Sequence, residues 1–191
     1  IMSFALPVFA VNIVTSVVNR VSVLMLGVLG TSEMVGVFSI VERLVRFGTI
    51  FMLSTGVMLR PMVSELVERK QFDELSRIYQ TSTRWILTVS LPYLLALAFN
   101  GSVILQVFGR EFETGSAALW YWVAAAAFDL ATGSAGVILM NGGRNIDLVI
   151  SEIARLIVVA GLNLLLIPSY GLDGAVIAVA AGIVLVNTLR V

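Results

Sequence analysis

Charged side chains inside apolar segments are the residues of this 191-residue chain whose types and spacing could do chemistry. The apolar segment 34–60 is long enough to cross a bilayer as a helix. Within it Glu42 and Arg46 lie one helical turn apart, and Arg43 lies beside them. Charge inside a spanning helix is costly, and it is usually kept where a helix face lines a wet cavity or meets a partner. The pattern therefore predicts a polar path through a helical bundle.

The apolar segment before it carries a polar stripe at steps of three and four residues. Ser, Thr and Asn commonly join membrane helices by hydrogen bonds, but an Arg at the edge of the same stripe favours a cavity wall. The stripe consists of Asn12, Thr15, Ser16, Asn19 and Ser22, with Arg20 at its edge.

Asp129 lies in a later apolar segment that is rich in small residues. One interpretation is that the small residues let another helix pack closely and that Asp129 pairs with a neighbouring Arg. The other is that the carboxylate takes up a proton or binds a cation during transport, and Glu42 is a second candidate for that role. The sequence leaves both interpretations of Asp129 open.

Two pairs of opposite charge stand at spacings that favour ion pairs within a helix. Glu42 precedes Arg46 by four residues, and Glu152 precedes Arg155 by three, so a structural role is expected for both pairs. Arg20 and Arg43 are then the unmatched cations and the better candidates for an anionic ligand.

Composition excludes several classes of function. Hydrophobic residues make up 59% of the chain and charged residues 13%, the formal net charge is zero, and Cys and His are absent. Without them there is no disulfide, no Cys/His metal site and no catalysis by a His base or a Cys nucleophile. We expect no metal, no cofactor and no nucleic acid partner. The chain runs from Ile1 to Val191 without an initiator Met and ends in an apolar run, so we expect a piece of a longer membrane protein.

The elements that must position these side chains are six apolar segments, each of roughly 18–27 residues, the length of a spanning helix. They predict an all-α, polytopic membrane protein with a six-helix bundle as a single unit over 1–191. The segments run over about 4–30, 34–60, 84–107, 116–140, 148–167 and 174–190. The connection 61–83 is charged and amphipathic, and it is predicted to lie as a helix at the membrane surface.

Orientation follows from Lys and Arg at the two ends of the helices, which predict that 61–83 and both termini lie in the cytoplasm. One end carries Arg60, Arg69, Lys70, Arg77, Arg84, Arg144 and Arg190, and the other carries Arg110. Aromatic residues are then expected at the outer interface, namely Phe112, Trp120, Tyr121 and Trp122. At about 1.5 Å per residue, the charges inside four different helices fall near the bilayer midplane. These are Arg20, Arg43, Arg46, Asp129 and Arg155.

Several short motifs, in this order and spacing, resemble one family. They are Asn19-Arg20, Val35-Gly36-Val37-Phe38 leading to Glu42-Arg43-Leu44, the turn 107–112, Gly143-Arg144, and the stretch 163–175. The chain resembles the C-terminal six-helix half of bacterial polysaccharide flippases, which belong to the multidrug/oligosaccharidyl-lipid/polysaccharide exporter superfamily. Asn19 is a departure, since many relatives carry Asp there.

The resemblance implies one lobe of a two-lobed, MATE-like transporter in the bacterial cytoplasmic membrane, and not an enzyme. The implied substrate is an oligosaccharide on polyprenyl pyrophosphate, flipped by alternating access for lipopolysaccharide or exopolysaccharide biosynthesis. Arg20, Arg43 and Arg46 would attract the pyrophosphate, and Asn12, Thr15, Ser16 and Asn19 would hydrogen-bond the sugar hydroxyls. The implied partners are membrane lipids, the N-terminal lobe of the same protein and polysaccharide polymerase machinery.

Three alternatives remain. A drug or cation antiporter of the same superfamily would prefer acidic, aromatic and Met residues to unpaired cations. An integral membrane lipid-sugar transferase usually places its acids in large loops, whereas the outer loops here offer Glu111, Glu113 and Asp173. A purely structural scaffold would bear the cost of the buried charges without using them.

Overall fold

The computed structural model describes residues 2–133, 139 and 145–190, which are almost entirely helical and contain no strand. The predicted all-α class is confirmed. The elements are α1 (Met2–Leu29), α2 (Ser32–Gly48), α3 (Ile50–Glu68), α4 (Phe72–Gln106), the 3-10 helix η1 (Arg110–Gly115), α5 (Ser116–Thr132) and α7 (Asn145–Arg190). Within these ranges α1, α3, α4 and α7 contain stretches long and apolar enough to cross a membrane. The protein is therefore a multi-pass membrane protein.

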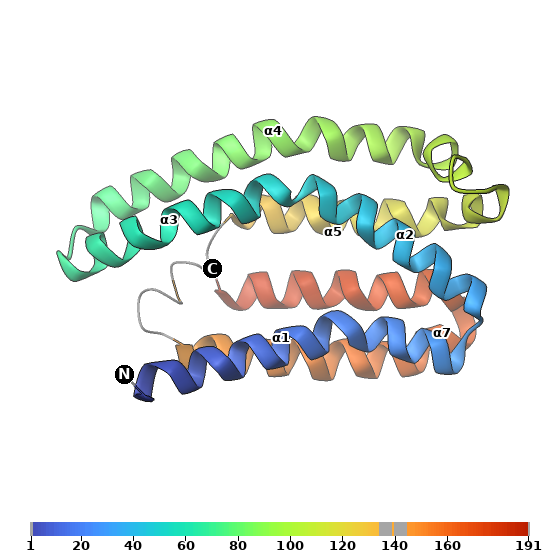
Figure 1. Ribbon diagram of the computed structural model, residues 1–191, viewed down its shortest axis with the longest axis horizontal. Coiled ribbons are helices and arrows are strands. Elements are labelled where there is room, and N and C mark those ends of the chain that lie inside the picture. The colour runs from blue at the N-terminus through green and yellow to red at the C-terminus, as the bar shows by residue number, and fades with distance from the viewer. Residues whose placement is uncertain (1, 134–138, 140–144, 191) are drawn as a thin grey trace.

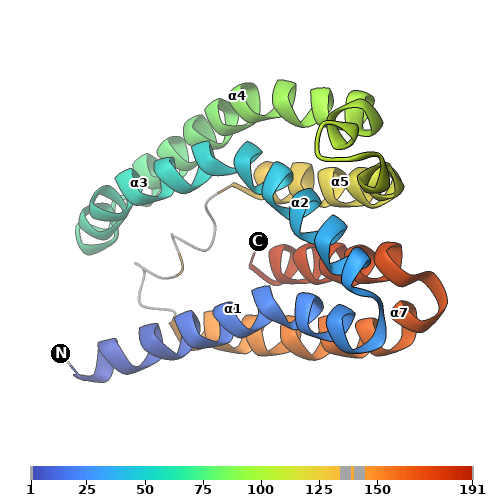
Figure 2. The same ribbon diagram turned by 45° about the vertical axis from the view of Figure 1, so that its right-hand side comes forward.

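The helices run roughly along one direction, in two layers joined by α2 (Figures 1 and 2). α3, α4 and α5 lie in one layer, and α1 lies beside α7 in the other. α2 starts at the end of α1 and crosses to the start of α3. The N-terminal end of α1 and the C-terminal end of α7 lie at the same end of the bundle (Figure 1), as the predicted even number of crossings requires.

The segment 34–60, predicted as one spanning helix, is two helices that meet at Thr49. Thr49 Oγ1 donates to the Arg46 carbonyl at 2.9 Å, and the Tyr93 hydroxyl of α4 donates to the Leu44 carbonyl at 3.0 Å. Gly48 packs so closely against α4 that an added Cβ would stand 2.7 Å from Tyr93 Cδ1. The prediction is wrong because the break is stabilised by contacts with α4, which local hydropathy does not reveal.

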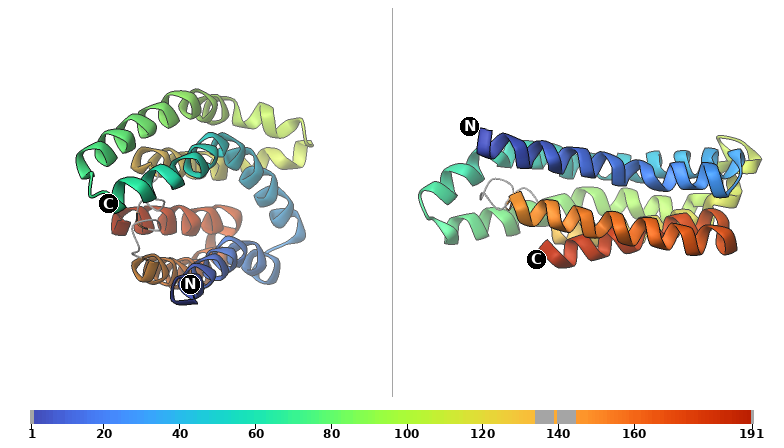
Figure 3. Two further views of the ribbon diagram at one scale, coloured as in Figure 1. Left: turned by 60° about the vertical axis from the view of Figure 1, so that its left-hand side comes forward. Right: turned by 90° about the horizontal axis from the view of Figure 1, so that it is seen from below.

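Residues 61–83 do not form the separate surface helix that their charge pattern suggests. Residues 61–68 complete α3 and residues 72–83 begin α4, so the two helices form a hairpin that extends past the ends of α1 and α7 (Figure 3, right). Lys70 turns the chain with φ 57°, and the Gln71 amide donates to the Leu66 carbonyl at 2.9 Å. Leu59, Val63, Leu66 and Leu75 form a small apolar cluster of their own, which supports the hairpin.

The two C-terminal segments, predicted as 148–167 and 174–190, are the two antiparallel arms of α7 (orange and red in Figure 1). The chain reverses at Gly171, which has φ 54° and ψ −123°, and not at Pro168, which lies inside the helical stretch. Proline can end a helix, but a reversal with positive φ favours glycine. The predicted fourth segment, 116–140, is helical as α5 to Thr132; its positions 134–138 and 140, and the Gly143-Arg144 motif, lie outside the described residues.

The main core joins five helices around the middle of the bundle. Its fully buried side chains include Leu26 from α1, Val41 from α2, Leu94 from α4 and Leu119 from α5. A small residue, Ala175, brings α7 into the same cluster. Thr31 caps the start of α2, its side chain accepting from the Met34 amide at 3.3 Å. The core fixes α1, α2, α5 and α7, the helices that carry the charges predicted near the midplane.

Candidate functional site

A first polar pocket lies between α1 and α2, with a volume of about 450 Å³. All of its lining residues are polar or charged: Ser16, Asn19, Arg20, Glu42, Arg43 and Arg46. Three guanidinium groups stand against one carboxylate there, so the lining carries a formal excess of two positive charges. We call this the α1–α2 pocket. Its chemistry suits an anion with several oxygen acceptors.

A second cavity, of about 400 Å³, lies among α1, α2, α5 and the two arms of α7. Its charges balance, because Glu42, Asp129 and Glu152 face Arg46, Arg155 and Arg190. The wall also contains the Phe38 and Trp122 rings, whose centroids are 4.9 Å apart. We call this the inner cavity. Asn19, Glu42 and Arg46 line both hollows, so these three residues are where the α1–α2 pocket and the inner cavity meet.

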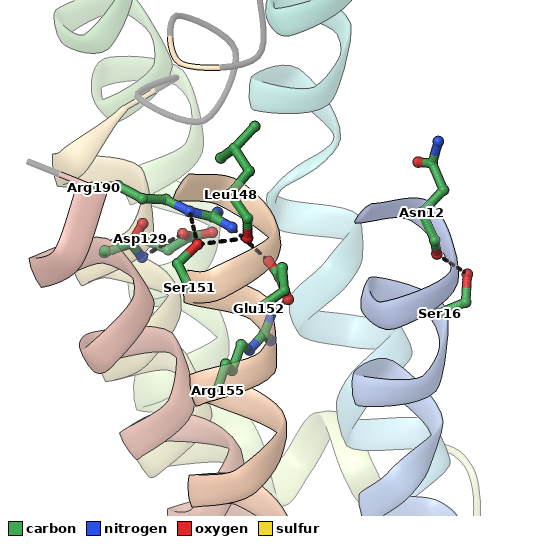
Figure 4. A network of polar contacts seen from close by, with 9 residues as sticks. Asn12, Ser16, Asp129, Leu148, Ser151, Glu152, Arg155 and Arg190 are labelled. Carbon is green, nitrogen blue, oxygen red and sulfur yellow. Dashed lines mark hydrogen bonds and ion pairs between the residues drawn. The ribbon is translucent and has the colours of Figure 1, made fainter. Parts of the chain in front are cut away.

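An ion-pair network joins the two arms of α7 at one side of the inner cavity (Figure 4). Arg190 donates to Glu152 Oε1 at 2.6 Å and to Ser151 Oγ at 3.3 Å. Arg155 forms an ion pair with the other carboxylate oxygen of Glu152, its NH1 atom lying 3.6 Å from Oε2. Glu152 is 3% exposed, and two guanidinium groups are the partners of its buried carboxylate.

Asp129 projects from α5 toward the same network. Its Oδ1 atom accepts from Asn187 Nδ2 at 2.7 Å, and it interacts electrostatically with Arg155 and Arg190. Asn187 and Arg190 are three residues apart and act from one face of the second arm of α7. The bonded partner of Asp129 is thus an amide, Asn187, which fixes the carboxylate, and the two guanidinium groups act on it through electrostatics.

The predicted binding residues divide between the two hollows. Ser16, Asn19, Arg20, Arg43 and Arg46 line the α1–α2 pocket, and Thr15, Asn19, Glu42, Arg46 and Asp129 line the inner cavity. Asn12 lines neither, and its backbone carbonyl accepts from Ser16 Oγ at 2.7 Å. Ser22, from the same stripe, is buried and accepts from Asn163 Nδ2 at 2.9 Å, which ties α1 to α7.

The two ion pairs predicted from local spacing are present. Arg46 donates to Glu42, and Arg155 pairs with Glu152. Sequence reasoning missed Asn187 and Ser151, and it treated Arg190 as a charge at the membrane edge. The spacing of Asn187 and Arg190 on one helix face was a usable signal, but their partners are distant in sequence. Trp122, expected at the outer interface, is 8% exposed and packs on Phe38 instead, because it shares the inward face of α5 with Ala126 and Asp129.

Comparison with known proteins gives one family. A family model described as MatE matches residues 7–165, which include most of α1, all of α2 to α5 and most of the first arm of α7. No curated protein and no solved structure matches the chain.

Proposed function

This chain belongs to the MatE family of membrane transporters, and we propose that it flips an oligosaccharide linked to polyprenyl pyrophosphate across the bacterial cytoplasmic membrane. In this proposal the chain is one lobe of a two-lobed transporter that works by alternating access. The product would serve surface polysaccharide biosynthesis. All substrates of this class share the pyrophosphate, which is anionic whichever sugar is attached.

The excess of guanidinium groups in the α1–α2 pocket carries the proposal. Arg20 comes from α1, and Arg43 and Arg46 come from α2, so two helices converge on one hollow. Guanidinium remains charged at all physiological pH values and forks onto phosphate oxygens, which gives it geometry as well as charge. Neutral or cationic cargo would gain nothing from such a lining.

In this proposal the adjoining inner cavity receives the sugar end of the same substrate. Its charges balance, and Thr15 and Asn19 offer hydroxyl and amide groups to sugar hydroxyls. A pyrophosphate in the α1–α2 pocket would hold the first sugars near Asn19, where the two hollows meet. The sugar type is then decided by the shape of the inner cavity together with the opposite lobe.

Export of surface polysaccharide in cells tests the proposal. Arg20→Ala and Arg43→Ala should each abolish export while the protein still inserts in the membrane at normal abundance. Arg84→Ala is the matched control, because Arg84 is an exposed arginine on α4 that lines neither hollow. Full export by both pocket variants would exclude the pyrophosphate role.

A second candidate, a drug or cation antiporter, is favoured by the wall of the inner cavity. Glu42, Asp129 and Glu152 stand there with Phe38, Trp122 and Met52, a combination that suits an organic cation. Two of the three carboxylates are in ion pairs, and Asp129 accepts from Asn187, so the cation would have to displace a partner. Drug resistance on overexpression, with unchanged surface polysaccharide on deletion, would favour this candidate.

A further inference from the structure

We infer that Glu42 is the specificity-determining residue of the α1–α2 pocket, an internal competitor that occupies Arg46 until an anionic ligand displaces it. The inference rests on the proposed function, because it concerns the same cationic pocket. It adds a role for a carboxylate that would otherwise be a static partner within one helix.

The position of the pair is the first observation. Glu42 and Arg46 lie one turn apart on α2, and Arg46 donates to Glu42 Oε1. Both residues line the α1–α2 pocket and the inner cavity. Among the ion pairs that the described part of the chain contains, those of Glu65 and Glu152 do not border the α1–α2 pocket.

The difference in exposure between the two partners is the second observation. The Arg46 side chain is 58% exposed and the Glu42 side chain 18%. An incoming anion can therefore reach the guanidinium without first uncovering the carboxylate. Exposed pairs of this kind are worth little, roughly 0–1 kcal/mol, so a doubly charged phosphate can replace Glu42 at Arg46.

The surrounding charges decide where the displaced carboxylate can go. On the α1–α2 side, Arg20 and Arg43 would be engaged with the same anion, and Glu42 would be repelled by it. On the inner side Glu42 faces a cavity that also holds Asp129, Glu152, Arg155 and Arg190. Glu152 already pairs with Arg190 and Arg155, so a displaced Glu42 would have to compete with it for these cations.

Two consequences follow for ligand binding. An anion that binds Arg46 competes with Glu42 for its guanidinium, so Glu42 weakens anion affinity and favours release. A ligand with a single weak charge competes poorly, so Glu42 also discriminates in favour of pyrophosphate over less charged headgroups.

Binding of radiolabelled inorganic pyrophosphate to the purified full-length protein tests the inference. Glu42→Gln should tighten binding about threefold or more, because Arg46 loses its charged competitor and the anion loses a repulsive neighbour. Glu42→Asp keeps the charge on a shorter side chain and should give a smaller gain. It is the second variant if Glu42→Gln does not fold. The matched control is Glu65→Gln, which breaks another i,i+4 pair with an Arg but lies outside both hollows.

The outcomes separate this inference from the proposed function. If wild-type protein binds pyrophosphate, Arg43→Gln weakens binding, and Glu42→Gln binds as Glu65→Gln does, the competitor role is wrong and the cationic pocket stands. Tighter binding by Glu42→Gln, with no such gain in Glu65→Gln, supports both the competitor role and the cationic pocket. Absence of binding in the wild type, or wild-type affinity in Arg43→Gln, overturns both.

Discussion

Arg190, the last residue of α7, donates to Glu152 Oε1 at 2.6 Å and so closes the hairpin of α7 between residues 38 positions apart. The pair lies where α5 also meets the two arms, since Asp129 and Asn187 are bonded in the same place. One part of the cavity wall is therefore held by ion pairs between the two arms of α7, whereas the pair of Glu42 and Arg46 lies within α2 and its arginine side chain is 58% exposed. We call the part held by Arg190 and Glu152 the fixed wall, and the pair of Glu42 and Arg46 is the part that a ligand can displace.

The fixed wall predicts a large loss of stability when its arginine is removed. Arg190→Ala leaves the buried Glu152 with Arg155 as its one remaining cation at a longer distance, and we expect a loss of about 3 kcal/mol. Thermal or denaturant unfolding in detergent measures it. Glu65→Ala, which breaks an exposed pair, should stay within about 0.5 kcal/mol of the wild type. Equal losses in the two variants would contradict the structural role of Arg190.

Asp129 offers a test between coupling and structure. Asp129→Asn keeps an acceptor for Asn187 and removes the charge, so we expect stability within about 1 kcal/mol of the wild type. If Asp129 couples ion movement to transport, export should fall at least about tenfold in this variant. Unchanged export with intact stability would assign Asp129 to structure alone. Asn187→Ala should lower stability by about 1–3 kcal/mol, since it leaves the carboxylate without its amide donor.

Two glycines in the membrane helices should respond to alanine in opposite directions. At Gly48 an added Cβ would stand 2.7 Å from Tyr93 Cδ1 and 2.9 Å from Leu94 Cδ2, so Gly48→Ala forces α2 and α4 apart. We expect a loss of about 1–3 kcal/mol from this overpacking. At Gly161 no neighbour lies within 4 Å, and Gly161→Ala should add about 0.5–1 kcal/mol through helix propensity. A gain at Gly48 would contradict the close approach of the two helices.

The buried contact between α1 and α7 predicts a modest but specific loss. Ser22→Ala removes the acceptor of Asn163 Nδ2 and leaves a fully buried amide unpaired, at an expected cost of about 1 kcal/mol. Ser54→Ala is the control, because the exposed Ser54 hydroxyl donates to a carbonyl of its own helix. The free energies of unfolding of both variants are measured under the same conditions. Equal values would show that the contact between Ser22 and Asn163 does not stabilise the protein.

Local sequence patterns predicted the local structure well. The apolar segments predicted an all-helical membrane protein, and the spacings of Glu42 with Arg46 and Glu152 with Arg155 predicted the pairs that form. These features depend on residues within one turn of each other. Their geometry is set by the helix itself, so a sequence is sufficient to predict them.

The features that sequence reasoning missed depend on residues distant along the chain. The division of 34–60 at Thr49 is stabilised by Tyr93, 49 positions from the Leu44 carbonyl that it bonds. Asn187 meets Asp129 across 58 positions. Hydropathy and residue spacing do not predict such contacts, because the contacts form only when helices pack against each other. The same limit explains why Arg190 was expected at a membrane edge although its guanidinium lies in the inner cavity.

The affinity of the purified full-length protein for polyprenyl pyrophosphate, without any sugar, tests the central claim most directly. We expect the wild type and Arg84→Gln to bind alike, and Arg20→Gln and Arg43→Gln each to bind at least about tenfold more weakly, since each loses a charge-assisted contact to phosphate. Polyprenol without phosphate should not compete. Equal affinity in all four proteins would contradict an anion site between α1 and α2.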